Sequence, residues 1–169
     1  MAAVLEFRLT GGASNTDPNA SLGGAMSSSA MPTNLFDDVS ADEASAGDTE
    51  YRAIDVYNSG DATATSVVIY MDPETSSPDT QIDLGYDTVN SPRDPANDAT
   101  SPPPSIPDES TAPTDGTNPI TFGHYVAGAG LTLPDIPAGQ AVRVWLKRTV
   151  AAGATNTASD TGTLKVEYA

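Results

Sequence analysis

Large apolar side chains are scarce in this chain, and their scarcity limits what it can fold into. Leu, Ile, Val and Phe together make up 29 of the 169 residues, or 17%, and Ala supplies another 24 apolar residues. A chain with less than about 20% of these large residues and a high net charge lies at the boundary of disorder. A core is therefore expected only where the large apolar residues cluster, with long polar excursions between the clusters.

The clusters alternate with a period of two, which places successive side chains on opposite faces of a β-strand. Such segments lie at 3–9, 51–57, 80–86, 141–150 and 163–168, with Gly- and Pro-containing turns between them. Two further strands are expected at 65–71, which is a continuous β-branched and apolar run, and at 120–125. The last segment, 163–168, is expected to pair antiparallel with 141–150. No apolar face of helical period exceeds two turns, although the acidic region 37–48 has room for one helical turn. The pattern predicts an all-β chain that forms a single antiparallel β-sandwich domain over residues 1–169.

The segment 141–150 has the longest alternation and predicts two different faces. One face carries Val142, Val144 and Leu146, and the other carries Arg143, Trp145 and Lys147. A Trp on a charged face is either covered by an arm or anchors an interface. We expect an arm, from the same chain or from a neighbouring one, to cover Trp145.

Two polar segments interrupt the strands. Residues 10–33 are rich in Gly, Ser, Asn and Ala, and their only large apolar residues are Leu22, Met26 and Met31. Residues 91–119 hold eight of the 14 prolines, which exclude a helix or a central strand there. We predict an extended N-terminal arm (10–33) and a long Pro-rich loop (91–119) that do not stabilise themselves and that dock on neighbouring subunits.

The chain is strongly acidic, with 23 Asp and Glu against 7 Lys and Arg and a net charge of −16. This balance argues against nucleic acid as a partner, because phosphate recognition needs a basic face, and it disfavours docking on an anionic membrane. No apolar run approaches the roughly 18 residues of a spanning helix. The first residues lack the basic and apolar regions of a signal peptide, so none is expected.

Basic residues gather near the C-terminus. Residues 139–169 carry Arg143, Lys147, Arg148 and Lys165 against two acids, whereas residues 1–138 carry three basic residues against 21 acidic ones. Two interpretations remain open. The basic strip of one subunit meets an acidic loop of another, or these cations balance the acids of their own domain.

Catalytic and metal-binding motifs are weak. Without Cys and with His124 as the one His, the chain has no thiol chemistry and no multi-histidine metal site. It contains no Gly-x-Ser-x-Gly elbow. The acids between Asp37 and Asp48 suit Ca²⁺, but an EF-hand starting at Asp37 fails, because Val39 takes a ligand position and Asp42 the glycine position. We therefore expect neither an enzyme nor a cofactor or metal site.

Two stretches of the sequence resemble immunoglobulin-like surface modules. The strand–turn–strand of these modules is similar to residues 56–70, VYNSGDATATSVVIY, and their turn and late strand to residues 136–145, IPAGQAVRVW. In its layout the opening, 7–24 followed by 34–39, resembles small virion proteins encoded among the structural genes of tailed bacteriophages. The resemblance implies an immunoglobulin-like sandwich and a capsid-decorating or other role on the virion surface.

We therefore expect a non-enzymatic virion structural protein, first of all a capsid decoration or cement protein. The expected partners are the major capsid protein or other virion subunits, including further copies of this chain, on the outer surface of the particle after synthesis in the host cytoplasm. The residues expected at the interface are Arg143, Trp145, Lys147, Arg148, Leu22, Met26, Met31 and Ile106. Two alternatives stay open: a tail, baseplate or fibre component, and a surface module that binds host glycans through Tyr57, Tyr86 and Tyr125.

Overall fold

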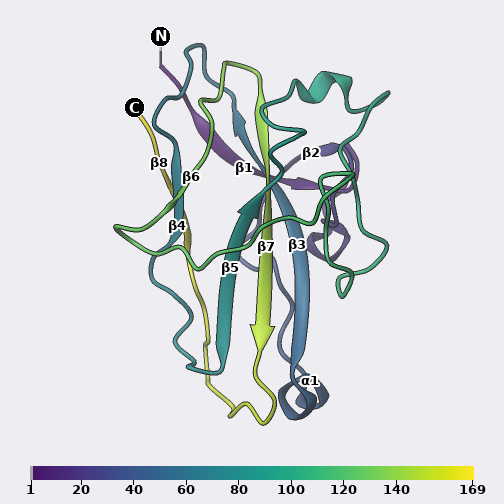
Figure 1. Ribbon diagram of the computed structural model, residues 1–169, viewed down its shortest axis with the longest axis vertical. Helices are drawn as coiled ribbons and strands as arrows, with labels where there is room; N and C mark the ends of the chain where they lie inside the picture. The colour runs from purple at the N-terminus through teal and green to yellow at the C-terminus, as the bar shows by residue number, and fades with distance from the viewer. Residues whose placement is uncertain (1) are drawn as a thin grey trace.

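Two antiparallel β-sheets pack against each other in the computed structural model, which describes residues 2–169 (Figure 1). The large sheet has the strand order β2-β1-β3-β7-β5, and the small sheet has the order β6-β4-β8. The strands are β1 (Leu5–Thr10), β2 (Met26–Ala30), β3 (Asp48–Asn58), β4 (Val68–Met71), β5 (Thr80–Tyr86), β6 (Leu131–Thr132), β7 (Ala141–Val150) and β8 (Leu164–Glu167). The helices are the α-helix α1 (Ala41–Ala46) and the 3-10 helices η1 (Pro18–Ala20) and η2 (Pro95–Asn97). The prediction of an all-β chain is confirmed, and within residues 2–169 no helix has the length and apolar character needed to cross a membrane.

The alternating segments form strands that bury their apolar sides together. β5 and β7 have the predicted bounds, and β3 extends the predicted 51–57 at both ends. β3 and β7 pair so that Ile54 lies opposite Val144 and Val56 opposite Val142. Because directly opposite residues share a face of the sheet, these side chains form one apolar surface, and all four are fully buried.

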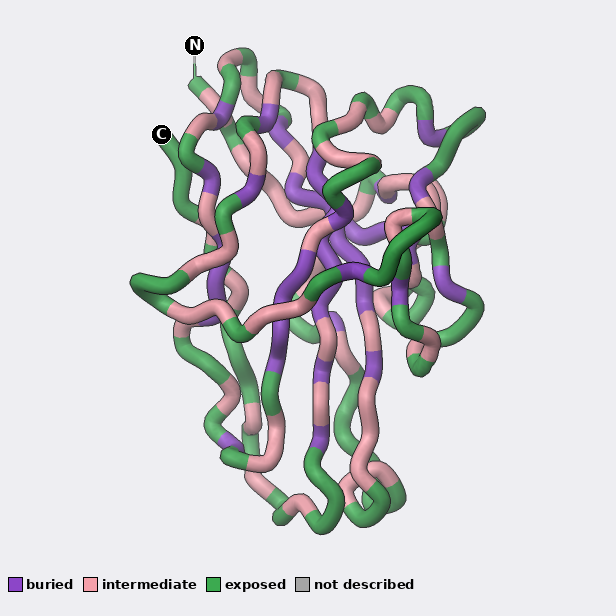
Figure 2. The backbone as a smooth tube through the Cα atoms, in the orientation of Figure 1, coloured by how far each residue is buried: buried purple, intermediate pink, exposed green. Residues whose placement is uncertain are grey.

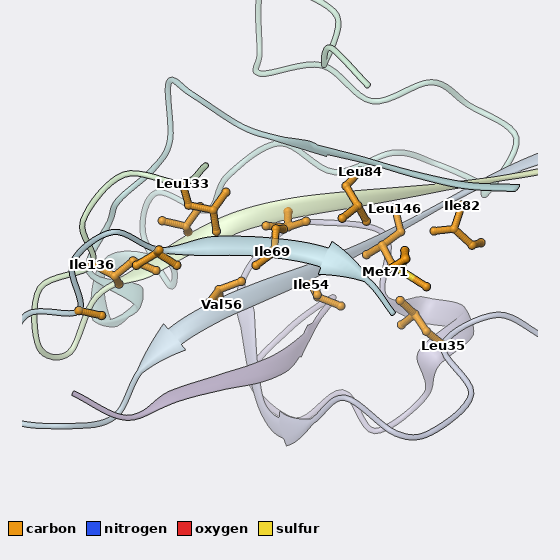
Figure 3. Packing of buried hydrophobic residues seen from close by; sticks show 14 of the residues in the cluster. Leu35, Ile54, Val56, Ile69, Met71, Ile82, Leu84, Leu133, Ile136 and Leu146 are labelled. Carbon is orange, nitrogen blue, oxygen red and sulfur yellow. The ribbon is translucent and has the colours of Figure 1, made fainter. Parts of the chain in front are cut away.

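The small sheet closes the other side of this apolar surface. Figure 3 shows Ile69 and Met71 of β4 facing Ile54 and Leu146 of the large sheet. Burying each such side chain contributes about 1.5–3 kcal/mol to folding. The few large apolar residues of the chain are therefore concentrated between the two sheets.

The prediction that the last strand pairs with its predecessor is wrong. β8 joins the small sheet, where Val166 lies opposite Ile69 and Leu164 opposite Met71 of β4. β7 has β3 on one side and β5 on the other, so it has no free edge to offer. The last strand pairs instead with the free edge of β4.

The predicted strand 120–125 does not form either. Its one ladder contact is an isolated bridge between Gly123 and Leu84 of β5. The segment passes close over Gly85, where a Cβ atom would lie 2.5 Å from the Thr121 carbonyl oxygen. It therefore crosses β5 and does not run alongside it.

The prediction that residues 10–33 form an extended arm that does not bury itself is also wrong. The segment turns back at Gly11 and Gly12 and forms β2, which pairs with β1. Ser21 and Ser27 are buried. Their hydroxyl groups donate to backbone carbonyls, 2.6 Å from Ser21 Oγ to the Ala53 oxygen, and small residues allow this close approach. The segment is folded by hydrogen bonds, although it has few large apolar groups.

Residues 91–119 likewise lie on their own chain. The segment contains η2 but no strand, and it joins the large sheet through an isolated bridge between Arg93 and Ala141 of β7. Figure 2 shows buried stretches in the peripheral segments as well as along the central strands. Ile106 is one of these buried residues. The expectation that this segment needs a neighbouring subunit for support is therefore corrected.

Candidate functional site on the charged face of the large sheet

A largely buried group of two arginines and two aspartates lies on the outer face of the large sheet, opposite the apolar core. We call Asp55, Arg93, Asp98 and Arg143 the outer ion cluster. Asp55, on β3, is fully buried and accepts from Arg143 Nε at 2.9 Å. Arg93 binds both oxygens of Asp55, at 2.9 and 2.8 Å, and also binds Asp98, at 3.0 and 2.9 Å. The two positive and two negative charges cancel within the cluster.

The outer ion cluster holds both polar segments against the sheet. Arg143 donates to the Gly24 carbonyl at 2.6 Å, and Asp98 accepts from the Met26 backbone N–H at 2.8 Å. Arg93 belongs to the Pro-rich loop, and its backbone N–H bonds the Ala141 carbonyl at 2.9 Å. The cluster thus joins β3, β7, the 10–33 segment and the 91–119 segment at one point.

The charges of this cluster persist despite burial. Burial by itself raises the pKa of Asp55, but the guanidinium groups of Arg143 and Arg93 hold that pKa below its usual value. Burial by itself lowers the pKa of Arg93, and Asp55 and Asp98 raise it above its usual value. Asp55 and Arg93 are therefore both charged at neutral pH, and their pairing acts as a fixed structural joint.

Acid is expected to loosen this joint. Because the folded-state pKa of Asp55 is lowered, its stabilising contribution is complete above the unfolded-state pKa of about 3.9 and is lost as the pH falls through the folded-state value. Urea unfolding of the wild type between about pH 5 and pH 2 should show this fall in the free energy of unfolding. For Asp55→Asn the free energy of unfolding should fall less over the same pH range. An equally large fall in this variant would contradict the role of Asp55.

Trp145 is buried next to this cluster, under the two polar segments. Its side chain is 1% exposed and packs with Ala53, Ile106 and Ile120, with Leu22 beside them. Above the ring the Ile106 N–H bonds the Leu22 carbonyl at 2.9 Å. We call these five residues the Trp145 layer. The expected covering of Trp145 by an arm is confirmed, and the arm belongs to the same chain.

Close approach in this layer depends on a glycine. Gly23 has a φ of +93°, and a Cβ atom there would lie 2.4 Å from the Pro104 carbonyl oxygen and 3.2 Å from the Trp145 ring. The neighbouring Gly24 N–H donates to that same carbonyl at 3.2 Å. The 10–33 and 91–119 segments therefore contact each other directly over the ring.

A second group of charges lies where β3 and β7 approach α1. Glu50 accepts from Arg148 at 2.5 Å, and Glu109 pairs with Arg52 at 2.5 Å. Both guanidinium groups lie over the ring of Phe36, with centroid distances of 4.9 Å for Arg148 and 5.5 Å for Arg52. These contacts fix the segment before α1 to the end of the large sheet.

Three carboxylates in this second group come within 4.8 Å of one another, those of Asp37, Glu50 and Glu109. Such a group has the oxygen ligands that a hard cation prefers. Here Arg52 and Arg148 pair with these same carboxylates and supply the positive charge. The arrangement is that of an ion-pair network.

Each of the seven Lys and Arg side chains pairs with an acid of the same chain. Besides the arginines already described, Arg8 pairs with Glu6, Lys147 with Asp83 and Lys165 with Asp72. Of the two interpretations of the C-terminal basic residues, the structure shows the pairing with acids of their own domain. Most of the 23 acids lie outside these pairs, so the surface presented to a partner is acidic.

The eight residues expected at an interface fall into two groups. Arg143, Trp145, Arg148 and Ile106 are buried within the chain, whereas Leu22, Met26, Met31 and Lys147 are partly buried. The structure brings Leu22, Ile106 and Trp145 together in one layer, with Arg143 in the adjoining cluster. Arg148 lies apart, beside Phe36. The buried members contact a neighbouring subunit only if the covering segments move away.

Sequence reasoning missed Asp55, Arg93 and Asp98. The available signal was a charged residue on the outward face of a strand, since Asp55 alternates with the apolar Ile54 and Val56 of β3. Asp55 lies directly opposite Arg143, but this relation emerges only when the register of the two strands is known. Arg93 and Asp98 come from the 91–119 segment, and the sequence of a loop does not indicate which strand residues it contacts.

The remaining candidates have structural surroundings. His124 lies 2.6 Å from Glu74 and 3.6 Å from Asp83, and its side chain is half exposed at the surface. Tyr86 and Tyr125 pack against the inter-sheet core, and Tyr57 lies beneath the guanidinium of Arg8. These three tyrosines do not form an exposed stacking platform for sugars.

An open groove of about 1160 Å³ lies at the α1 end of the sandwich. Its apolar wall includes Leu35, Met71 and Leu164, and its rim includes Asp38 and Asp160. Arg148 also lines the groove, so charges of both signs lie beside the apolar wall.

Comparisons with protein-family profiles, with curated proteins and with solved structures give no match.

Proposed function

We propose that this protein is a non-enzymatic structural protein of a virion, with an immunoglobulin-like sandwich that decorates and stabilises the capsid from outside. The observation that carries the proposal is the use of all seven basic side chains in pairs within the chain. The sandwich therefore presents an acidic exterior around a buried, internally neutralised framework. The sequence layout, which resembles small virion proteins, supports the same role.

An acidic exterior favours a partner with a basic surface. Complementary charge guides encounter and sets orientation more than it sets final affinity. It also keeps the free protein soluble and repels the packaged nucleic acid. A shell of major capsid protein with basic outer patches is the partner that this proposal names.

The structure changes how such a protein would stabilise a shell. The 10–33 and 91–119 segments are already ordered on their own sheet by the outer ion cluster and the Trp145 layer. Ordered segments lose little conformational freedom on docking, so more of the contact energy appears as affinity. The protein would act as a rigid block and not through flexible arms.

Sedimentation with assembled heads tests this proposal. Heads built from the major capsid protein of the same virus are mixed with the purified chain and sedimented at roughly 0.05 and 0.5 M salt. We expect the chain to sediment with heads at low salt and to be released at least in part at high salt. Parallel samples contain purified tails or no particles.

Sedimentation with tails alone would favour a tail, baseplate or fibre component. Failure to bind heads at either salt concentration would contradict the capsid role. A glycan array on the same preparation separates the host-binding alternative, for which specific sugar binding is the expected signal.

A further inference from the structure

β8 is an edge strand whose outward backbone groups have no partner within residues 2–169. It pairs only with β4, with Lys165 opposite Tyr70 and Glu167 opposite Val68. The Asp72 N–H bonds the Thr163 carbonyl at 2.8 Å, which places the hydrogen-bonded pairs at the odd-numbered residues of β8. The backbone groups of Leu164, Val166 and Tyr168 therefore point away from β4.

The edges of the large sheet are less available. At one edge, the N–H and the carbonyl of Leu84 on β5 both bond Gly123, each at 2.9 Å. At the other edge, β2 is a short, Ser-rich strand, and the backbone N–H of Met26 is held by Asp98. Exposed edges invite pairing with another strand. In the small sheet the other edge strand, β6, has only two residues, so β8 is the longer free edge.

Apolar groups surround the free edge of β8. Leu164 and Val166 pack only partly against the inter-sheet core, and so do Leu5 and Phe7 of β1. Tyr168 is 40% exposed, and its hydroxyl lies 3.4 Å from the Leu5 backbone N–H. Figure 1 shows this segment leading to the C-terminus at the margin of the molecule. A strand added here would cover apolar surface from both sheets.

The sequence of this edge, Leu164-Lys165-Val166-Glu167-Tyr168, is complementary to itself when it runs antiparallel. With Val166 opposite its own copy, Lys165 lies opposite Glu167 twice and Leu164 lies opposite Tyr168 twice. Opposite charges and apolar pairs in directly facing positions stabilise a sheet. In this register Leu164, Val166 and Tyr168, whose backbone groups point outward, occupy the hydrogen-bonded positions. The two strands therefore share roughly six interchain hydrogen bonds.

We infer that two copies of this chain form a twofold-symmetric dimer through β8. Pairing of the two edges joins the small sheets into one continuous sheet with the order β6-β4-β8-β8-β4-β6. Such an isologous contact closes on itself and leaves no new edge. The inference does not rest on the virion role, because it concerns the purified chain alone.

The charged side chains are already positioned on the exposed face of this strand. Lys165 Nζ lies 2.8 Å from Asp72, and Glu167 accepts from the Tyr70 hydroxyl at 2.5 Å. Both contacts involve β4 or the residue after it, so they leave the side toward the second copy open. Lys165 has further donors for the Glu167 carboxylate of the other copy.

Charge-reversal variants test the register directly. Sedimentation equilibrium of the wild type is expected to show a concentration-dependent dimer. Lys165→Glu or Glu167→Lys alone places like charges opposite each other at two positions, and each should weaken dimerisation about tenfold or more. The double variant Lys165→Glu with Glu167→Lys restores both opposite pairs and should dimerise like the wild type. Asp42→Lys, on exposed α1, makes the same charge change as Glu167→Lys away from β8 and should leave dimerisation unchanged.

Mixing the two single variants gives the sharpest result. In a heterodimer of Lys165→Glu with Glu167→Lys, both facing pairs again join opposite charges, so the mixture should dimerise although each variant alone does not. Circular dichroism verifies that every variant is folded. A wild type that stays monomeric at all concentrations would overturn the inference, and so would a mixture that fails to recover dimerisation. Either result leaves the sedimentation of the chain with heads as a separate question.

Discussion

Replacing Asp55 by Asn is expected to lower the free energy of unfolding by about 3–5 kcal/mol. The substitution preserves shape but removes the charge that Arg143 and Arg93 share. Within the described chain, Arg143 would then lose its only carboxylate partner, and Arg93 would keep only that of Asp98. A domain of this size is stable by only about 5–15 kcal/mol, so the loss is readily measured by urea unfolding followed by circular dichroism.

An exposed ion pair provides the matched control for this prediction. Asp72 pairs with Lys165 where both side chains are nearly half exposed, and such surface pairs contribute little to stability. Asp72→Asn is therefore expected to unfold at the same urea concentration as the wild type. Equal, small effects of the two substitutions would show that the outer ion cluster does not hold the fold together.

Truncating Trp145 to Ala is the second substitution with a large expected effect, a loss of about 3–5 kcal/mol. The ring is 1% exposed and lies under Leu22 and Ile106. Its removal leaves a cavity beneath the two segments that cover it. Thermolysin, which cleaves before large apolar residues, should therefore cut the variant near these two positions well before it cuts the wild type.

Trp145→Phe serves as the control, because it keeps an aromatic ring in the layer and leaves a smaller cavity. Within residues 2–169 the indole Nε1 has no hydrogen-bond partner, so this substitution breaks no hydrogen bond there. We expect its stability and its cleavage to lie close to those of the wild type. If thermolysin cleaved Trp145→Ala as slowly as it cleaves the wild type, the two segments would be held against the sheet without the Trp145 ring.

The strands of the core were predictable from sequence because their side chains alternate without interruption. β7 places Val142, Val144 and Leu146 on the core face, as the period of two predicts, and its bounds agree at both ends. The bounds of β5 also agree with the prediction, because its side chains alternate in the same way. These elements need only local information, since each apolar residue faces the core on its own strand.

The pairing of β8 was not predictable in this way. Its alternation fits any free edge, and the choice between β7 and β4 depends on which edges the other strands have occupied. Leu164 and Val166 face the core from the small sheet. Their alternation with Lys165 and Glu167 would fit a place in the large sheet equally well. Strand partnership is a non-local property that a pattern within one strand does not contain.

The burial of the two polar segments was missed for a different reason. Ser21, Gly23 and Pro104 are held by backbone and hydroxyl hydrogen bonds and by close approach. Such residues are small or polar, so the composition of the two segments predicted that they are exposed to solvent or docked on a neighbouring subunit. The same holds for Asp55, whose partner Arg143 lies 88 residues away in sequence.

Hydrogen exchange of the isolated chain tests most directly whether the polar segments are folded on their own sheet. The amides of Ala53 and Ile106 donate to the carbonyls of Ser21 and Leu22, at 2.7 and 2.9 Å. The account predicts that both amides are protected in the purified chain, together with those of the β3–β7 ladder. Exchange of these two amides at the rate of an unfolded chain, while the ladder stays protected, would contradict it.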